Sequence, residues 1–126
     1  MDNELKQIYK ILTSDLRGRC PIKEALTLYG AKDKVIVHIK QVPGNKKGLL
    51  IDSKNIYIDP SCSPGEAFVT LIHELEHWKN KDFLKRKETL RSNEIWAIEE
   101  RRTQDAFHIA RMWHEKNLKE CDRNEK

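Results

Sequence analysis

The segment from Ser63 to Trp78 constrains the fold most, because it combines a clear helix start with a long apolar helix interior. Ser63 can cap the helix, Pro64 suits the first helical position, and Glu66 follows the serine at the spacing of a capping box. Apolar residues then recur through the segment as far as Trp78. We therefore predict one long helix here, against which the rest of the chain must pack.

The interior of this helix contains His73-Glu74-Leu75-Glu76-His77, an HExxH sequence. Residues four apart share one helical face, so both imidazoles can reach one metal ion. Glu74 lies just around that face and can approach the remaining coordination position without being a ligand. A shuffled chain of this composition contains HExxH with a probability of roughly 0.02, and the in-phase position inside a capped helix favours a real site. We predict Zn²⁺ ligands at His73 and His77, with Glu74 as the catalytic general base.

A catalytic zinc usually has three protein ligands and one open position, so a third ligand must come from elsewhere. The final predicted helix offers three glutamates: Glu94, Glu99 and Glu100. Glu99 and Glu100 both border residues that can pack against the HExxH helix, whereas Glu94 has more solvated neighbours. His108 and His114 are alternative nitrogen donors. His38 lies inside a strand pattern and is expected to be structural.

The remaining patterns indicate an α+β fold in one domain, residues 1–126. Apolar residues at helical spacing predict N-terminal helices within residues 1–30. Stretches rich in β-branched residues predict a small, mostly antiparallel three-stranded sheet within residues 34–59. Pro43-Gly44-Asn45 and Asp52-Ser53-Lys54 predict the turns between its strands. Residues 63–119 would form the active-site helices. The strand from Asn55 to Asp59, if it lies at a sheet edge, could align an extended substrate.

Composition limits the functional classes. With 38% hydrophobic and 35% charged residues among 126, the chain suits one compact domain. No apolar run approaches the roughly 20 residues that span a bilayer, and the first residues lack the features of a signal peptide, so we expect no membrane partner. Three well-separated cysteines, Cys20, Cys62 and Cys121, form no CxxC pair and fit a reducing cytoplasm.

The net charge of +4 could suggest nucleic acid, but the pattern does not favour it. Lysines and arginines are spread along the chain among 20 acidic residues, and the densest basic stretch, Lys79 to Arg91, directly follows the HExxH motif. Aromatic residues are not interleaved with basic ones as in a base-stacking platform. A solvated surface is the better interpretation.

Two segments resemble the ImmA/IrrE group of zinc metallopeptidases. Residues 55–78, NIYIDPSCSPGEAFVTLIHELEHW, resemble that group's strand, proline turn, capped helix and HExxH in order. Residues 100–107, ERRTQDAF, resemble its later E-R-x-A-N-x-F-A pattern, which favours Glu100 as the third ligand. The likeness covers residues 48–113, with Glu76 where the group often has glycine and Arg111-Met112-Trp113 in place of an apolar ending. It implies an intracellular protease that acts on protein or peptide substrates. In some relatives the substrate is a repressor partner encoded by a mobile element.

Two other functions stay open at this point. A non-catalytic zinc protein, acting as a sensor or scaffold, would use the same ligands, and Glu76 favours this alternative if it adds a carboxylate close to the metal. A basic nucleic-acid-binding module would make HExxH accidental, bind no zinc and show a strongly salt-dependent affinity.

Overall fold

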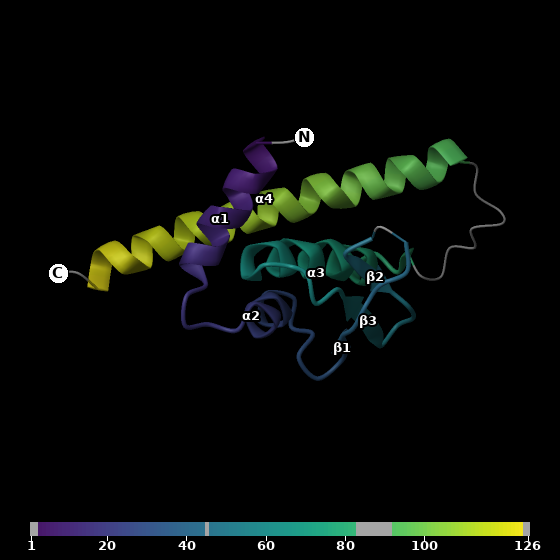
Figure 1. Cartoon of the computed structure of the whole chain (residues 1–126), viewed down its shortest axis with the longest axis horizontal. Coiled ribbons are helices and arrows are strands. Elements are labelled where there is room, and N and C mark those ends of the chain that lie inside the picture. The colour runs from purple at the N-terminus through teal and green to yellow at the C-terminus, as the bar shows by residue number, and fades with distance from the viewer. Residues whose placement is uncertain (1–2, 45, 83–91, 125–126) are drawn as a thin grey trace.

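The computed structural model describes residues 3–44, 46–82 and 92–124. Helices and strands follow one another in the order α1 (Asn3–Asp15), α2 (Pro21–Leu28), β1 (Ile36–Ile39), β2 (Gly48–Leu50), β3 (Asn55–Ile58), α3 (Pro64–Lys79) and α4 (Ser92–Asn124). The predicted α+β class is confirmed, with two helices before the sheet and two after it (Figure 1). Most of the basic stretch after α3, residues 83–91, and Asn45 of a predicted turn lie outside the described residues.

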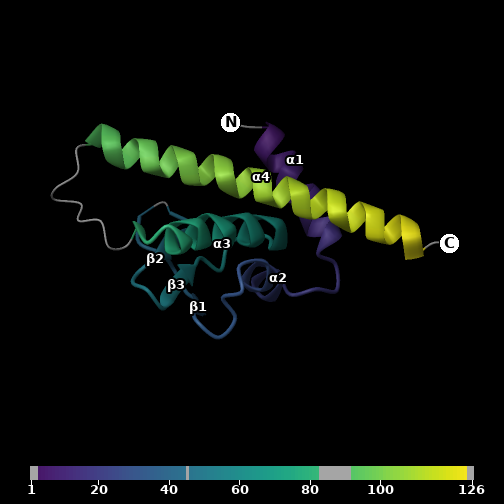
Figure 2. The ribbon, with the colours of Figure 1, turned by 180° about the vertical axis from the view of Figure 1, so that it is seen from behind.

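Helix α3 forms the centre of the molecule. Figures 1 and 2 show it between the long α4 on one side and α2 with the sheet on the other. Its capping serine accepts a hydrogen bond from the Glu66 backbone N–H (3.2 Å), as the sequence predicts. Its interior is almost wholly buried, and the side chains with at most 4% exposure include Phe68, Val69, Leu71, Ile72 and Leu75. Packing on several sides explains why its sequence is apolar nearly all round.

The sheet is mixed, with strand order β1-β3-β2. Strands β2 and β3 form an antiparallel hairpin, whose turn is closed by Asp52 Oδ1 accepting from the backbone N–H groups of Lys54 (2.8 Å) and Asn55 (2.9 Å). Strand β1 lies on the other side of β3 and runs parallel to it. The local turn residues predict the hairpin. The parallel β1–β3 pair depends on how the chain crosses the sheet, which no local pattern predicts. The sheet is therefore mixed, whereas the sequence predicted a mostly antiparallel one.

The central position of β3 corrects another expectation. Residues 55–58 pair with a strand on each side and therefore cannot accept an added strand. The edge strand next to α3 is β2. Within the described residues, none of the helices is both long and apolar enough to cross a bilayer.

Helix α1 crosses the start of α3 at Gly65. The Gly65 backbone N–H donates to Thr13 Oγ1 (2.9 Å), which donates to the Tyr9 carbonyl (2.8 Å). A Cβ atom at Gly65 would lie 2.1 Å from that carbonyl oxygen, far inside van der Waals contact. Glycine therefore permits the close approach of the two helices.

We predict that Gly65→Ala lowers the free energy of unfolding by about 1–3 kcal/mol, the usual cost of overpacking. Helix propensity alone would make the same change stabilising by about 1 kcal/mol, so the sign separates the two effects. Chemical denaturation measures it. Thr13→Val serves as a comparison without overpacking, because it loses the two hydrogen bonds of the Thr13 hydroxyl, each worth about 1 kcal/mol. A Gly65→Ala protein as stable as the wild type would contradict the close crossing.

Candidate metal centre

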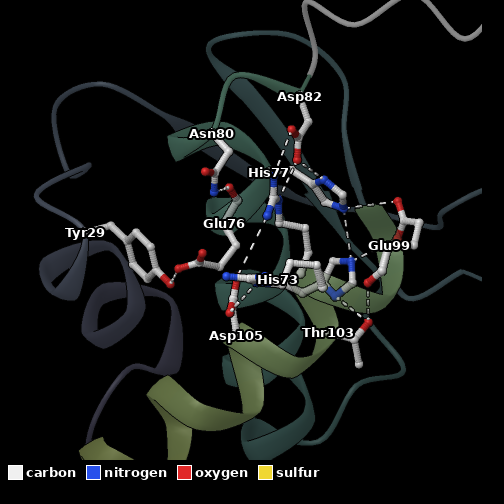
Figure 3. Close-up of polar contacts among 11 residues, drawn as sticks. Tyr29, His73, Glu76, His77, Asn80, Asp82, Glu99, Thr103 and Asp105 are labelled. Atoms are coloured by element: carbon white, nitrogen blue, oxygen red, sulfur yellow. Dashed lines mark hydrogen bonds and ion pairs between the residues drawn. The ribbon is translucent and has the colours of Figure 1, made fainter. Parts of the chain in front are cut away.

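Two histidines of α3 and one glutamate of α4 converge on one point (Figure 3). The Nε2 atoms of His73 and His77 lie 3.1 Å apart. The Glu99 carboxylate reaches both of them, with Oε2 3.1 Å from His73 Nε2 and Oε1 3.1 Å from His77 Nε2. The HExxH spacing thus brings its histidines together as predicted, and α4 adds a carboxylate to them.

The carboxylate at this point belongs to Glu99, not to Glu100, which the resemblance favoured. One helical residue is a rotation of about 100°, so adjacent glutamates cannot reach the same point. Glu100 is exposed and outside the cluster, and its carboxylate accepts a long hydrogen bond (3.4 Å) from Gln104 Nε2. The buried stripe of α4 gives the signal that could have decided between them. Its members are 99, 103, 106, 110, 113 and 117, a 4-3-4-3-4 spacing. Residues 106, 110, 113 and 117 are buried, and Glu99, although itself exposed, is in phase with them.

The other candidate ligands lie elsewhere. Glu94 and His108 are exposed and outside the cluster. His114 binds the Asp15 carboxylate of α1 through Nδ1 (2.5 Å) and so joins α1 to α4. His38 Nε2 binds Asn55 Oδ1 (2.9 Å) across the sheet, which agrees with a structural role.

The second nitrogen of each clustered histidine faces an oxygen. His77 Nδ1 lies 2.8 Å from Asp82 Oδ2, and His73 Nδ1 lies 3.3 Å from Thr103 Oγ1. The Thr103 hydroxyl donates its hydrogen to the Glu99 carbonyl (2.9 Å), so towards His73 it acts as an acceptor. In the neutral imidazoles that metal binding requires, both Nδ1 atoms are then the protonated donors and both Nε2 lone pairs point at the cluster. Without a metal, a proton on Nε2 instead donates to the Glu99 carboxylate. Two lone pairs 3.1 Å apart repel each other unless a cation, either a proton or a metal ion, lies between them.

The charges of the cluster agree with this arrangement. Hydrogen bonds from His73 and His77 hold the pKa of the Glu99 carboxyl well below its usual range, although burial opposes them. Burial lowers the pKa of His77, but hydrogen bonds to Glu99 and Asp82 outweigh it and leave the pKa raised. Glu99 is therefore ionised at neutral pH, which a metal ligand requires.

Glu74 lies beside the cluster, enclosed between α3 and β2. It is 8% exposed, and the Leu50 backbone N–H forms a hydrogen bond with its carboxylate. Burial raises its pKa, and the nearby His73 and His77 oppose that effect. Gly48 lets β2 come this close, because a Cβ atom there would lie 2.6 Å from Thr70 Cγ2 and 3.3 Å from Glu74 Cγ.

Glu76, two residues later, points away from the cluster towards α2 (Figure 3). It is 5% exposed, and its carboxylate accepts a hydrogen bond from the Tyr29 hydroxyl. Burial, together with that hydrogen bond, raises the pKa of Tyr29. The expectation that Glu76 adds a carboxylate close to the histidines is therefore wrong, because the helix carries it to a different face from His73 and His77.

The cluster opens into a cleft of about 590 Å³ between α3, α4 and β2, with Tyr9 of α1 at its border. This volume lies within the range of small-molecule and peptide sites. His73, Glu74, His77 and Glu99 line it together with apolar side chains: Tyr9, Leu49, Leu50, Val69, Ile95, Ile98, Ala106 and Phe107. A polar cluster inside a largely apolar cleft is a typical arrangement for a reactive site.

Sequence reasoning did not identify Asp82, Arg102 or Thr103 as part of this site. Thr103 lies one turn after Glu99 and could have been found from that spacing. Asp82 follows the end of α3, where no periodicity applies, so no sequence signal places it beside His77.

The chain matches no protein-family model, and no curated protein or solved structure is significantly similar to it.

We predict that Glu99→Ala loses bound zinc while Glu100→Ala keeps about one zinc per chain. Removal of a ligand should weaken binding beyond the ~10–100-fold typical of the residues that orient ligands. Elemental mass spectrometry of the purified proteins, reloaded with zinc and desalted, measures the result. The two variants differ by one position on the same helix, so each controls for the other. Equal zinc in both would remove Glu99 from the ligand set.

Proposed function

We propose that this protein is a zinc-dependent peptidase that hydrolyses peptide bonds in a protein or peptide substrate. The convergence of two histidine Nε2 atoms and one ionised carboxylate, beside a buried glutamate in a cleft, carries this proposal. Two histidines and one glutamate are a known ligand set of catalytic zinc.

The residues fit such an ion. His73 and His77 direct their Nε2 atoms to one point, and an oxygen atom lies beside each Nδ1 to accept its hydrogen when Nε2 binds a metal. Glu99 approaches the same point with both carboxylate oxygens. Zinc bound by these three residues would supply Lewis-acid chemistry, lowering the pKa of water from 15.7 towards about 7 and polarising a carbonyl.

Glu74 is the proton carrier in this proposal. Its carboxylate is not part of the three-residue cluster but lines the same cleft, so it can face the attacking water. It would accept a proton from that water and pass it to the departing peptide nitrogen. The Leu50 N–H hydrogen bond and the surrounding apolar side chains hold the carboxylate in place for both transfers.

Strand β2 provides an edge along which a substrate can lie. Lys47 and Ile51 exchange backbone hydrogen bonds with β3, through Asp59 N–H to the Lys47 carbonyl (2.8 Å) and Ile51 N–H to the Asn55 carbonyl (2.9 Å). Because hydrogen-bonded pairs alternate in an antiparallel ladder, the backbone groups of Gly48 and Leu50 point away from β3. Because the Leu50 N–H already faces Glu74, the Gly48 backbone groups and the Leu50 carbonyl are the groups to which an extended peptide could add. This edge replaces the one first expected at Asn55 to Asp59.

The walls of the cleft indicate the chemistry of the substrate. Leu50, Ile98 and Phe107 are partly exposed and present apolar surface within the same cleft as the cluster, so apolar substrate side chains should occupy it. A repressor as the physiological substrate is implied only by the resemblance to the ImmA/IrrE group. Cys20 and Cys62 are free thiols, which agrees with the proposed cytoplasmic location.

The non-catalytic zinc alternative loses the feature that favoured it, because Glu76 binds Tyr29 and not the cluster. Both zinc-binding functions predict the metal, and only turnover separates them. The nucleic-acid alternative predicts no zinc.

We predict that Glu74→Gln keeps its zinc and loses turnover by about 10²–10⁴-fold, the usual contribution of a general base. His77→Ala should lose both zinc and turnover. Glu76→Gln is the matched control, the same change on another face of the same helix, and should keep both. Hydrolysis of a quenched-fluorescence peptide library, beside elemental analysis, measures the set.

Retained hydrolysis in Glu74→Gln would remove the proposed base. A wild-type protein that binds zinc but cleaves no peptide would favour the sensor or scaffold. A wild-type protein that binds no zinc after reloading would contradict both zinc functions and direct attention to nucleic acid.

A further inference from the structure

A further residue of α4, Arg102, is connected to the cluster through Asp82. Arg102 Nε lies 2.7 Å from Asp82 Oδ2, and its Nη2 lies 3.2 Å from Asp82 Oδ1. The same Asp82 carboxylate accepts from His77 Nδ1. Both side chains are enclosed, with 11% exposure for Arg102 and 8% for Asp82. A continuous path of buried polar contacts therefore runs from α4 to one of the two histidines.

The turn after α3 places Asp82 beside the end of that helix. Helix α3 ends at Lys79, and Asn80 forms its C-terminal cap. Lys81 then adopts a positive φ of 56°, which turns the chain back over the last turn of the helix. Contacts with the surrounding side chains direct the Asp82 carboxylate, and those of His77 and Arg102 are among them. The guanidinium supplies two of them in a planar fork, which fixes both the position and the plane of a carboxylate.

We propose that Arg102 is a positioning residue that sets the zinc affinity of this site by holding Asp82 against His77 Nδ1. The inference rests on the proposed function, since it concerns the same metal. Asp82 fixes the tautomer and the ring orientation of His77, so that Nε2 faces the ion. Arg102 in turn compensates the charge of a carboxylate that would be costly to bury with the neutral imidazole of a metal-bound histidine.

The position of Arg102 in α4 explains how the cluster is assembled. Glu99, Arg102 and Thr103 lie within about one helical turn, on the side that faces α3. In this single turn of α4, Glu99 contacts both histidines and Thr103 contacts His73 Nδ1. Arg102 holds the Asp82 that contacts His77 Nδ1. Any shift of α4 along or around its axis would disturb all three contacts together.

The test is zinc affinity, measured by competition with a chromogenic chelator, for Arg102→Met, Arg102→Lys, Asp82→Asn and the double variant Asp82→Asn/Arg102→Met. We expect Arg102→Met to bind zinc about tenfold more weakly, at the low end of the ~10–100-fold effect of residues that orient metal ligands. Arg102→Lys keeps the charge but not the planar fork, so its zinc affinity should fall between those of the wild type and Arg102→Met. Because Arg102 acts through Asp82, the double variant should bind zinc no more weakly than Asp82→Asn alone.

Arg101→Met is the matched control. Arg101 is the preceding residue, its side chain is 72% exposed, and it pairs with Asp105 rather than Asp82. It should leave the zinc affinity unchanged. Thermal melting of the metal-free proteins provides a separate readout, because a purely structural role would lower the melting temperature without changing the affinity of the folded molecules.

The inference is overturned if Arg102→Met binds zinc within twofold of the wild type, or if the effects of Asp82→Asn and Arg102→Met simply add. Should Arg102→Met fail to fold, Arg102→Lys decides the question by the same criterion. A wild-type protein without zinc would overturn the proposed function as well. Normal zinc affinity in the wild type and in every Arg102 variant would overturn this inference alone.

Discussion

The packing of α4 along α3 is the contact on which the candidate site depends. Ala106 and Ala110 are small and fully buried, so the two helices can approach closely, while Trp113 packs its ring 4.8 Å from that of Phe68. These contacts determine the rotation of α4 about its own axis. Because Glu99 continues the same stripe beyond the apolar core, the packing that fixes the rotation of α4 also fixes the position of Glu99. A substitution that changes this packing should therefore affect the cluster even when it touches none of its residues.

Helix α3 carries the histidines and the glutamates of its motif on different faces. One face carries His73 and His77, whose Nε2 atoms meet Glu99. Another carries Glu76, which is enclosed but satisfied by the Tyr29 hydroxyl of α2. Buried carboxylates are tolerated when they receive hydrogen bonds, so the Tyr29–Glu76 contact joins α2 to α3 without adding charge to the cleft. Glu74 is enclosed like Glu76 but lines the cleft, so of the two motif glutamates Glu74 is the one beside the place of the proposed proton transfer.

The sheet contributes mainly by presenting β2 to α3. Strand β3 occupies the centre, and β1 protects its other side by parallel pairing. Strand β2 is thereby left as an edge next to the cleft, with Gly48 allowing the close approach and Leu50 donating to Glu74. The same edge that stabilises the proposed base thus offers backbone groups to an extended ligand.

Local chemistry in the sequence was sufficient for several features of this protein. The Ser63 cap, the span of α3, the pairing of His73 with His77 and the hairpin turn at Asp52 each depend on residues a few positions apart. The choice of Glu99 over Glu100, the contacts of Asp82 and the order of the strands do not. They follow from the rotation of one helix against another, from the path of the chain after α3 and from the crossing between β1 and β2. Each of these joins residues distant in the chain, and their relative positions are decided only when the whole core packs.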